Sequence, residues 1–401
     1  MSAVIHGRYP RTQRALPVRD PLRLDPWLLF AAATLLALGW VMVGSASITV
    51  ADRKLGEPLY YLTRQSVFIG IALAVAWMVF RTSLETWRRI SPVLLLLGMI
   101  SLVLVLIPGI SREVNGSMRW LRVGPMGLQP SEFVKVFIVL FIAGYLVRRG
   151  DELREQLSGF MKPLAIVGGI GLLLLLEPDF GATGVLMATV VGMLFLGGVK
   201  VWQFLLLMVG GMAGSWYLIV SSPYRLERLT AFLNPWADPF NSGFQLTQAL
   251  IAFGRGEWFG VGLGGSVQKL FYLPEAHTDF LFAVLAEELG LVGALGVVVL
   301  FTLLIARTFL IGARAQRAGL FYGAYLAWGL GICLGLQALI NIGVNMGALP
   351  TKGLTLPLMS YGGSSIIVAC MMVALILRVD LEVRELEVTG EAAGGALWRE
   401  E

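Results

Sequence analysis

Acidic and basic side chains that could do chemistry gather where the longest polar stretch of the chain meets an apolar one. Glu275, His277 and Asp279 lie close together in YLPEAHTDF, directly before a long apolar run. A carboxylate held at such an edge has the chemistry of a general base. Capping of the next helix by Thr278 or Asp279 is the simpler structural explanation. We expect Asp279 to be the catalytic group.

Two more carboxylates, Glu287 and Glu288, follow in the same apolar run. At 1.5 Å per residue they would lie roughly two helical turns deeper than Asp279. Adjacent carboxylates inside a membrane span are costly unless they are paired or hydrated. A polar cavity beneath Asp279 is therefore expected.

A second group of ionisable residues lies in NGSMRWLRVGPMGLQPSEFVKV, residues 115–136. Glu132 and Lys135 are spaced so that they can pair on one face of a helix beginning at Pro130 and Ser131. Lys135 falls about one turn inside the apolar run, where ionisable groups usually face a cavity. A capped helix entering the membrane, with Trp120 at the interface, is the alternative.

A tight acidic turn, EPDFGATG (177–184), joins two apolar runs. Asp179 can cap the second run, which is the simpler explanation. The functional alternative is that Asp179 pairs with Lys135 or with a loop arginine at the mouth of the same cavity.

The segment GALPTKGLTLPLMSYGGSS (347–365) places a cation, small residues and hydroxyls before the last apolar run. Small residues permit close helix packing, which is one explanation. Contact with a phosphate or a sugar is the other. The candidate binding residues in this segment are Lys352, Ser360, Tyr361, Gly362, Gly363 and Ser364.

Composition defines the elements that must hold these residues. Of the 401 residues, 57% are hydrophobic and 14% are charged, against roughly 25% charged in soluble domains. Apolar runs of about 20 residues, each long enough to cross a bilayer, predict an all-α polytopic membrane protein with about ten spans. The predicted spans are 26–49, 60–80, 91–109, 131–148, 162–177, 180–198, 202–221, 279–306, 319–346 and 356–378.

The distribution of Lys and Arg predicts the orientation. The positive-inside rule favours both termini in the cytoplasm and the large loop 222–278, between the seventh and eighth spans, outside. We expect an arginine-rich tail over 1–25, a membrane domain over 26–378 and a flexible tail over 379–401. Within the loop, 243–253 has helical apolar spacing typical of an interfacial helix. A dinucleotide-binding loop is a poor explanation for the glycines of 254–265, because no strand precedes them. They suit tight backbone turns near a ligand instead.

The sequence does not support a disulfide framework or a structural zinc site. Cys333 and Cys370 both lie in apolar spans, and two histidines without a Cys/His cluster give no zinc ligand set. No nucleic-acid partner is expected.

Taken together, five motifs resemble the SEDS family (shape, elongation, division and sporulation), and the likeness runs from the first span to the last. They are NGSMRWL…QPSEFVK, EPDFG, NPWADPFNSGFQLTQ, FYLPEAHTDFLFAVLAEELG and PTKGLTLPLMSYGGSS. The sequence of the loop 222–278 and the arginine-rich amino tail are most similar to the cell-division branch of that family.

The resemblance implies a glycosyltransferase that polymerises lipid II into glycan strands at the outer face of the bacterial inner membrane, at the division septum. It assigns the essential aspartate to Asp279, the charged pair to Glu132 and Lys135, and the acid of EPDFG to Asp179. It also implies a partner, a class B penicillin-binding protein that acts as the septal transpeptidase, together with other division proteins.

A departing undecaprenyl pyrophosphate needs positive charge. The candidates are Arg119, Lys135, Arg225, Arg228, Arg255, Lys269 and Lys352, or a divalent cation such as Mg²⁺ or Mn²⁺. The alternative function is a lipid II flippase, with Glu287, Glu288 and Lys135 along its pathway. A scaffold that only recruits the transpeptidase would leave the residues around Asp279 unexplained.

Overall fold

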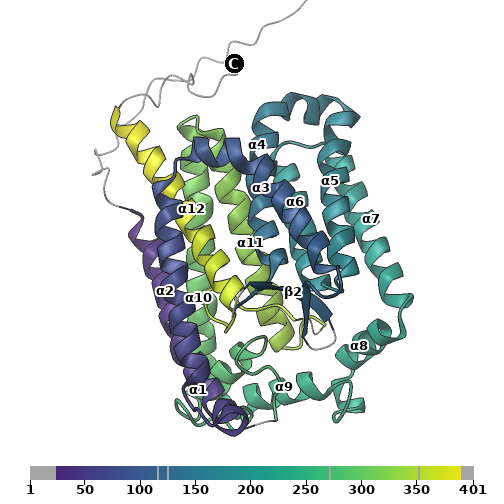
Figure 1. Ribbon diagram of the computed structural model, residues 1–401, viewed down its shortest axis with the longest axis vertical. Helices are drawn as coiled ribbons and strands as arrows, with labels where there is room; N and C mark the ends of the chain where they lie inside the picture. The colour runs from purple at the N-terminus through teal and green to yellow at the C-terminus, as the bar shows by residue number, and fades with distance from the viewer. Residues whose placement is uncertain (1–23, 115–116, 124–125, 271, 351–352, 390–401) are drawn as a thin grey trace, which may run out of the picture.

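The chain forms a bundle of long helices that run side by side along the vertical direction of Figure 1, with shorter elements at the lower end. This computed structural model describes residues 24–114, 117–123, 126–270, 272–350 and 353–389. Ten long helices occur within those ranges: α1 (Pro26–Leu55), α2 (Tyr60–Arg81), α3 (Leu84–Val105), α4 (Pro130–Glu155), α5 (Leu157–Leu176), α6 (Phe180–Leu196), α7 (Val201–Val220), α10 (Leu281–Arg317), α11 (Phe321–Asn345) and α12 (Gly363–Thr389).

These helices confirm the predicted all-α polytopic fold. Seven of them, α1 to α5, α10 and α11, are long and apolar enough to cross a membrane by length and composition. The helix α4 lies deep in the bundle, where it packs against α3, α5, α6 and α11. In contrast, the apolar side chains of α7 are largely exposed at the edge of the bundle.

Local sequence signals start and stop the helices. The Asp25 carboxylate accepts a hydrogen bond from Leu28 N at 3.0 Å and so caps α1, with Pro26 in its first turn. The same helix ends at Gly56, whose φ of 71° favours a residue without a β-carbon. Ser83 caps α3 through Thr86 N at 3.3 Å.

A small antiparallel sheet joins α3 to α4, where the sequence predicted only a connecting segment. Its strands are β1 (Ser111–Val114), β2 (Ser117–Val123) and β3 (Met126–Leu128), in that order. The sheet lies at the lower end of the bundle in Figure 1.

The long segment between α7 and α10 lies across the same end of the bundle (Figure 1) and contains α8 (Pro223–Leu233), a 3-10 turn η1 (Pro235–Ala237) and α9 (Phe244–Gly256). The predicted helix over 243–253 is confirmed as α9, whereas α8 was missed. Gly260 has a φ of 78° and packs where a β-carbon would overlap the Glu288 carbonyl. The predicted tight turns are confirmed by the positive φ of Gly260, Gly262 and Gly264, and Gly260 also permits a close approach to α10.

The helix α10 breaks at Gly290 (φ 67°, ψ −167°). Around the break, Val261 N donates to Glu287 O at 3.0 Å and Leu291 N donates to Glu257 O at 2.9 Å. The residues after the break, 291–317, extend about 40 Å as a helix, enough to cross a core about 30 Å thick. Glu287 and Glu288 precede this part, in the short helical segment on the same side of the break as Asp279.

At the opposite end of the bundle, buried ion pairs tie α1, α10 and α12 together. Asp25 pairs with Arg307, and Asp380 accepts from Arg314 at 2.8 Å and from Arg384 at 2.9 Å. Because these contacts hold the end of α12, residues 379–389 are helical and not part of the flexible tail that the sequence predicted.

Candidate active site

Asp279 lies at the head of α10, but its side chain does not cap that helix. The N-cap residue is Phe280, which makes no side-chain cap bond. The first turn is capped from α11 instead, because Asn345 Oδ1 accepts a hydrogen bond from Ala283 N at 3.0 Å. Among the described residues no side-chain or backbone donor is bonded to the Asp279 carboxylate. The capping explanation for Thr278 and Asp279 is thus wrong, and the carboxylate is available for chemistry.

The segment that precedes α12 fastens the loop carrying Asp279. Ser360 Oγ donates to Thr278 O at 2.5 Å, and Tyr361 N donates to His277 O at 3.0 Å. Ser360 Oγ also accepts from Leu356 N at 2.9 Å. The Ser360 hydroxyl was predicted to contact substrate, but it holds backbone in place.

His277 lies in an aromatic cluster. Its ring is 4.7 Å from the ring of Tyr61 and 5.5 Å from that of Tyr361, measured between centroids. Burial lowers the pKa of His277 from its usual value of 6.5. A neutral imidazole that packs between tyrosines supports the loop and is no source of positive charge.

The electrostatic environment of Asp279 favours a proton near neutral pH. Burial raises the pKa of its carboxyl to about 7 from the usual 3.8. The negative charges of Glu275 and Asp179 raise this pKa further, whereas the positive charge of Arg119 lowers it. The fold therefore brings together Asp279, Glu275, Asp179 and Arg119 from three separate parts of the sequence.

Arg119 reaches from β2 to the turn between α5 and α6. Its Nη2 donates to Pro178 O at 2.6 Å and its Nε donates to Glu177 O at 3.1 Å. Trp120, the next residue, covers Gly127 of β3, where a β-carbon would lie 3.1 Å from the indole ring. Burial raises the pKa of the Glu177 carboxyl to about 8, and Asp179 adds to this rise. Glu177 is consequently protonated at neutral pH.

Asp179 is a helix cap. Its Oδ1 accepts from Ala182 N at 3.1 Å at the start of α6, and its Oδ2 accepts from Ser131 Oγ at 3.2 Å. The simpler explanation from the sequence is confirmed, and the direct pairing with Lys135 is wrong.

Lys135 forms the predicted pair with Glu132, at 2.9 Å, and both side chains are almost fully buried. Its ammonium also donates to Gln337 Oε1 at 2.7 Å, and Gln337 Nε2 donates to Thr355 O at 3.1 Å. The pair therefore supports the segment before α12 from within the bundle, and Lys135 has no free face for a phosphate.

Some of the remaining residues predicted to contact substrate serve the fold instead, and others lie outside the described parts. Ser364 Oγ accepts from Gln129 N at 3.0 Å, and Gly363 packs where a β-carbon would come within 2.8 Å of the Phe68 ring, so both serve packing. Gly362 begins the same turn without so close a contact. Outside the described parts lie Lys352 and the side chains of Arg225 and Arg228.

Comparison with known proteins fits this arrangement. The profile of a family described as cell cycle protein, covering FtsW, RodA and SpoVE, matches residues 26–385. The chain belongs to this FtsW/RodA/SpoVE family. A relative from Nitrosococcus halophilus is 62% identical over 94% of this chain and 97% of its own length, and one from Thioalkalivibrio sulfidiphilus is 56% identical over 96% of each. Both are named probable peptidoglycan glycosyltransferase FtsW.

Solved structures share the fold. One comes from a peptidoglycan synthase complex described as coordinating polymerization and crosslinking, with a TM-score of 0.73 and 32% identity over 90% of this chain and 99% of that one. The rod shape determining protein RodA of Thermus thermophilus has a TM-score of 0.67 and 30% identity, over 90% of this chain and 97% of that one. The family fold thus extends over nearly the whole described chain.

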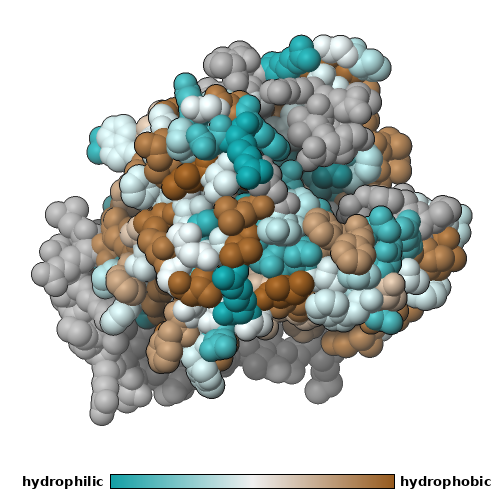
Figure 2. Space-filling view, turned by 90° about the horizontal axis from the view of Figure 1, so that it is seen from below, coloured by the Kyte–Doolittle hydropathy of each residue, from teal (hydrophilic) through white to brown (hydrophobic). Residues whose placement is uncertain are grey.

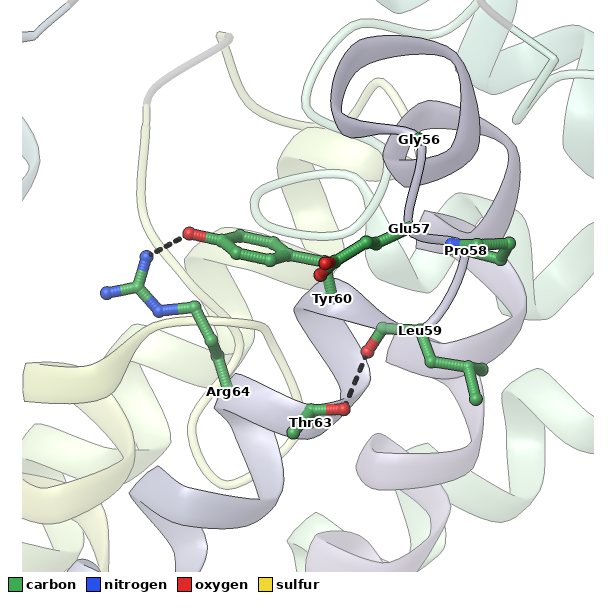
Figure 3. A pocket seen from close by; sticks show the side chains of 7 residues that line it. All are labelled: Gly56, Glu57, Pro58, Leu59, Tyr60, Thr63 and Arg64. Atoms are coloured by element: carbon green, nitrogen blue, oxygen red, sulfur yellow. Dashed lines mark hydrogen bonds between the residues drawn. The ribbon is translucent and has the colours of Figure 1, made fainter.

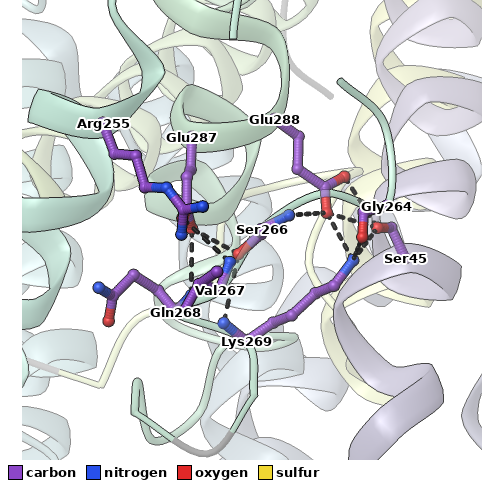
Figure 4. A network of polar contacts seen from close by, with 9 residues as sticks. All are labelled: Ser45, Arg255, Gly264, Ser266, Val267, Gln268, Lys269, Glu287 and Glu288. Atoms are coloured by element: carbon purple, nitrogen blue, oxygen red, sulfur yellow. Dashed lines mark hydrogen bonds and ion pairs between the residues drawn. The ribbon is translucent and has the colours of Figure 1, made fainter. Parts of the chain in front are cut away.

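Other cations expected to bind pyrophosphate in this FtsW/RodA/SpoVE member pair elsewhere. Lys269 Nζ binds Glu288 at 2.7 Å and Ser45 Oγ at 2.9 Å, while Arg255 pairs with Glu287 at 3.3 Å (Figure 4). Both glutamates are fully buried. The network ties the loop to α1 and α10 and engages all four side chains with partners inside the protein.

The surface at this end is mixed, with hydrophilic groups between hydrophobic ones (Figure 2). An open pocket of about 520 Å³ lies at the turn from α1 to α2, where Arg64 Nη1 donates to Tyr60 Oη at 2.8 Å (Figure 3). It contains none of the predicted site residues. The pocket is lined only by residues between Gly56 and Arg64, and so belongs to the turn itself.

The described residues do not fit a protein-held divalent cation. Within the described ranges, His, Cys, Asp and Glu form no group of three that could hold a metal. Asp179 already accepts hydrogen bonds from Ala182 N, Ser131 Oγ and Gln129 Nε2, and Glu275 accepts one from Thr278 at 2.7 Å.

Three functional residues were missed from the sequence. Gln337, Asn341 and Asn345 of α11 all contact the backbone of the site segments. They recur every four residues in an otherwise apolar helix, so they form one polar stripe. That spacing was the available signal, because polar residues inside a span usually face partners.

Proposed function

We propose that this chain is a peptidoglycan glycosyltransferase that polymerises lipid II into glycan strands during cell division. The observation that carries the proposal is the carboxylate of Asp279, partly buried and without a bonded donor among the described residues, at the mouth of a membrane-spanning bundle. The names of the relatives support the reaction class.

The mechanism follows from that carboxylate. Ionised Asp279 accepts the proton of the acceptor sugar's 4-hydroxyl, whose oxygen forms a bond to the anomeric carbon of the donor. The bond from that carbon to the pyrophosphate oxygen breaks, and its electron pair leaves with undecaprenyl pyrophosphate. Attack opposite the leaving group inverts the anomeric configuration. General-base assistance of this kind contributes about 10²–10⁴-fold in rate.

Positive charge near the leaving group comes from fewer residues than the sequence suggested. Arg119 remains, since its guanidinium lies close enough to Asp279 to lower the carboxyl pKa, and only two of its five N–H donors are used by the turn. Lys352, the second candidate from the sequence, lies outside the described residues.

The membrane arrangement of the proposal follows the distribution of positive charge. Lys and Arg are more numerous in the segments at the end of the bundle away from Asp279, which supports a cytoplasmic location for both termini and a periplasmic location for Asp279. A class B penicillin-binding protein is the proposed partner at the division septum, because a structural relative belongs to a complex of polymerization and crosslinking.

The alternative, a lipid II flippase, is less favoured because Glu287, Glu288 and Lys135 are engaged in buried pairs. Vesicles containing the full-length chain with its transpeptidase, and labelled lipid II in the leaflet facing Asp279, separate the two. We expect polymer on that side. Transfer of label between leaflets without polymer would reject the proposal.

The rate should depend on pH. Because ionised Asp279 is the base and its pKa is raised to about 7, polymerisation should increase with pH with a midpoint near 7. The folded chain holds this proton more tightly than the unfolded chain, so the contribution to unfolding free energy is largest below about pH 4 and is lost towards pH 7. Initial rates from about pH 5 to 9 test the prediction; a flat profile contradicts it.

A further inference from the structure

The carbonyl of Asp279 is held by two buried asparagines of α11. Asn345 Nδ2 and Asn341 Nδ2 each donate to Asp279 O at 2.9 Å. Asn341 also donates to Leu354 O at 2.5 Å, in the segment before α12. The two asparagines are 0% and 2% exposed, so no solvent competes for these bonds.

Asn345 makes a second contact that bears on the carboxylate itself. Its Oδ1 accepts from Ala283 N at 3.0 Å, and this amide, in the first turn of α10, also donates to Phe280 O at 3.1 Å. An aspartate just before a helix is among the preferred residues to satisfy such an amide. Since Asn345 Oδ1 and Phe280 O already accept from this amide, Asp279 is not drawn into capping.

We propose that Asn345, assisted by Asn341, is a positioning residue for the polymerisation reaction: it caps α10 in place of Asp279 and fixes the main chain from which the reactive carboxylate projects. The inference rests on the proposed function of Asp279. A purely stabilising cap would need only the bond to Ala283. Two donors on one carbonyl engage both of its lone pairs and so fix the origin of the Asp279 side chain.

The charges that act on Asp279 come from every side of the site. Glu275 lies on the same loop as Asp279, Asp179 lies on the turn before α6, and Arg119 lies on β2. The helix α11 contributes only neutral amides. The side chain of Lys352 lies outside the described residues. A new charge or a new hydrogen bond at position 345 should therefore move the midpoint of the pH–rate profile.

Two substitutions of Asn345 should move the midpoint of the pH–rate profile in opposite directions. Asn345→Leu removes the bonds to Asp279 O and Ala283 N, together with those to Asn341, at similar volume. The Asp279 carboxylate can then turn to Ala283 N and share it with Phe280 O, and a hydrogen bond to the charged form lowers the midpoint below 7. Asn345→Asp keeps an acceptor for Ala283 but adds negative charge, which raises the midpoint. For both we expect kcat to fall about 10–100-fold, with KM within about threefold, because misplacement of the base affects the reaction more than binding.

The experiment uses the purified full-length chain with its transpeptidase and lipid II, and records kcat, KM and the pH midpoint. Thr308→Val is the control, because this buried hydroxyl donates only to Leu304 O of its own helix at 2.8 Å; it should leave the midpoint unchanged. Thermal unfolding verifies that each variant is folded, and Asn345→Asp decides the question if Asn345→Leu does not fold.

Opposite shifts support the proposal. Wild-type kcat and midpoint in folded Asn345 variants would overturn it, as would a change in KM alone. Asp279→Asn in parallel separates the two hypotheses. If it polymerises normally, the proposed function fails; if it is inactive while the Asn345 variants behave as wild type, only the positioning role fails.

Discussion

Asp279→Asn should reduce kcat for lipid II polymerisation by about 10²–10⁴-fold, the range by which a positioned general base accelerates proton transfer. The amide has nearly the same shape as the carboxylate but cannot accept the proton of the acceptor hydroxyl. Because Asn341 and Asn345 bind the main chain of residue 279, the variant keeps its fold. The measurement is the steady-state rate with purified protein and lipid II.

Glu275→Gln is the matched control for this substitution. Glu275 belongs to the same loop, is exposed and accepts a hydrogen bond from Thr278. We expect less than about a tenfold change in rate, together with a lower pH midpoint, because a negative charge that raises the pKa of Asp279 is removed. A loss for Glu275→Gln as large as that for Asp279→Asn would show that the loop, and not one carboxylate, is required.

Lys135→Met should destabilise the chain by about 3–5 kcal/mol, since it leaves the Glu132 carboxylate buried without its cation. The hydrogen bond to Gln337 is lost as well, which frees the segment holding Thr355. Thermal unfolding in detergent measures the loss. Activity should decline with stability, because this segment fastens the loop of Asp279.

The double variant Glu132→Gln/Lys135→Met separates charge from packing. Replacing both members removes the uncompensated charge and should recover a large part of the lost stability. Equal stability of Lys135→Met and the wild type would contradict a buried ion pair. Equal damage in the single and double variants would indicate that Gln337, and not Glu132, is the important partner.

The long helices could be predicted because each is an apolar run of spanning length, and most predicted bounds agree with the structure to within a few residues. The break at Gly290 could not, because apolar residues continue on both sides of it and only the pairing with 257–262 reveals it. For the same reason the sequence did not reveal that Glu287 and Glu288 precede a break in the helix. Their partners, Ser266 and Lys269, come from a loop whose path the sequence does not specify.

The sequence predicted which residues belong to the candidate site, but not the contacts that these residues make with other helices and strands. The sequence singled out Asp279, and the pairing of Glu132 with Lys135 followed from helical spacing, which is a local property. Capping of α10 by Asn345 depends on how α11 packs against α10, so a local rule assigned that role wrongly to Thr278 or Asp279. Arg119 approaches Asp279 only because an unpredicted sheet projects it onto the turn at Pro178.

The most direct test of Asp279 as the base measures substrate binding and polymer in one sample of the Asp279→Asn variant, assembled with its transpeptidase. We predict lipid II binding within about threefold of the wild type and polymer reduced by at least about 10²-fold. Polymer formed at the wild-type rate by the bound variant would contradict the account.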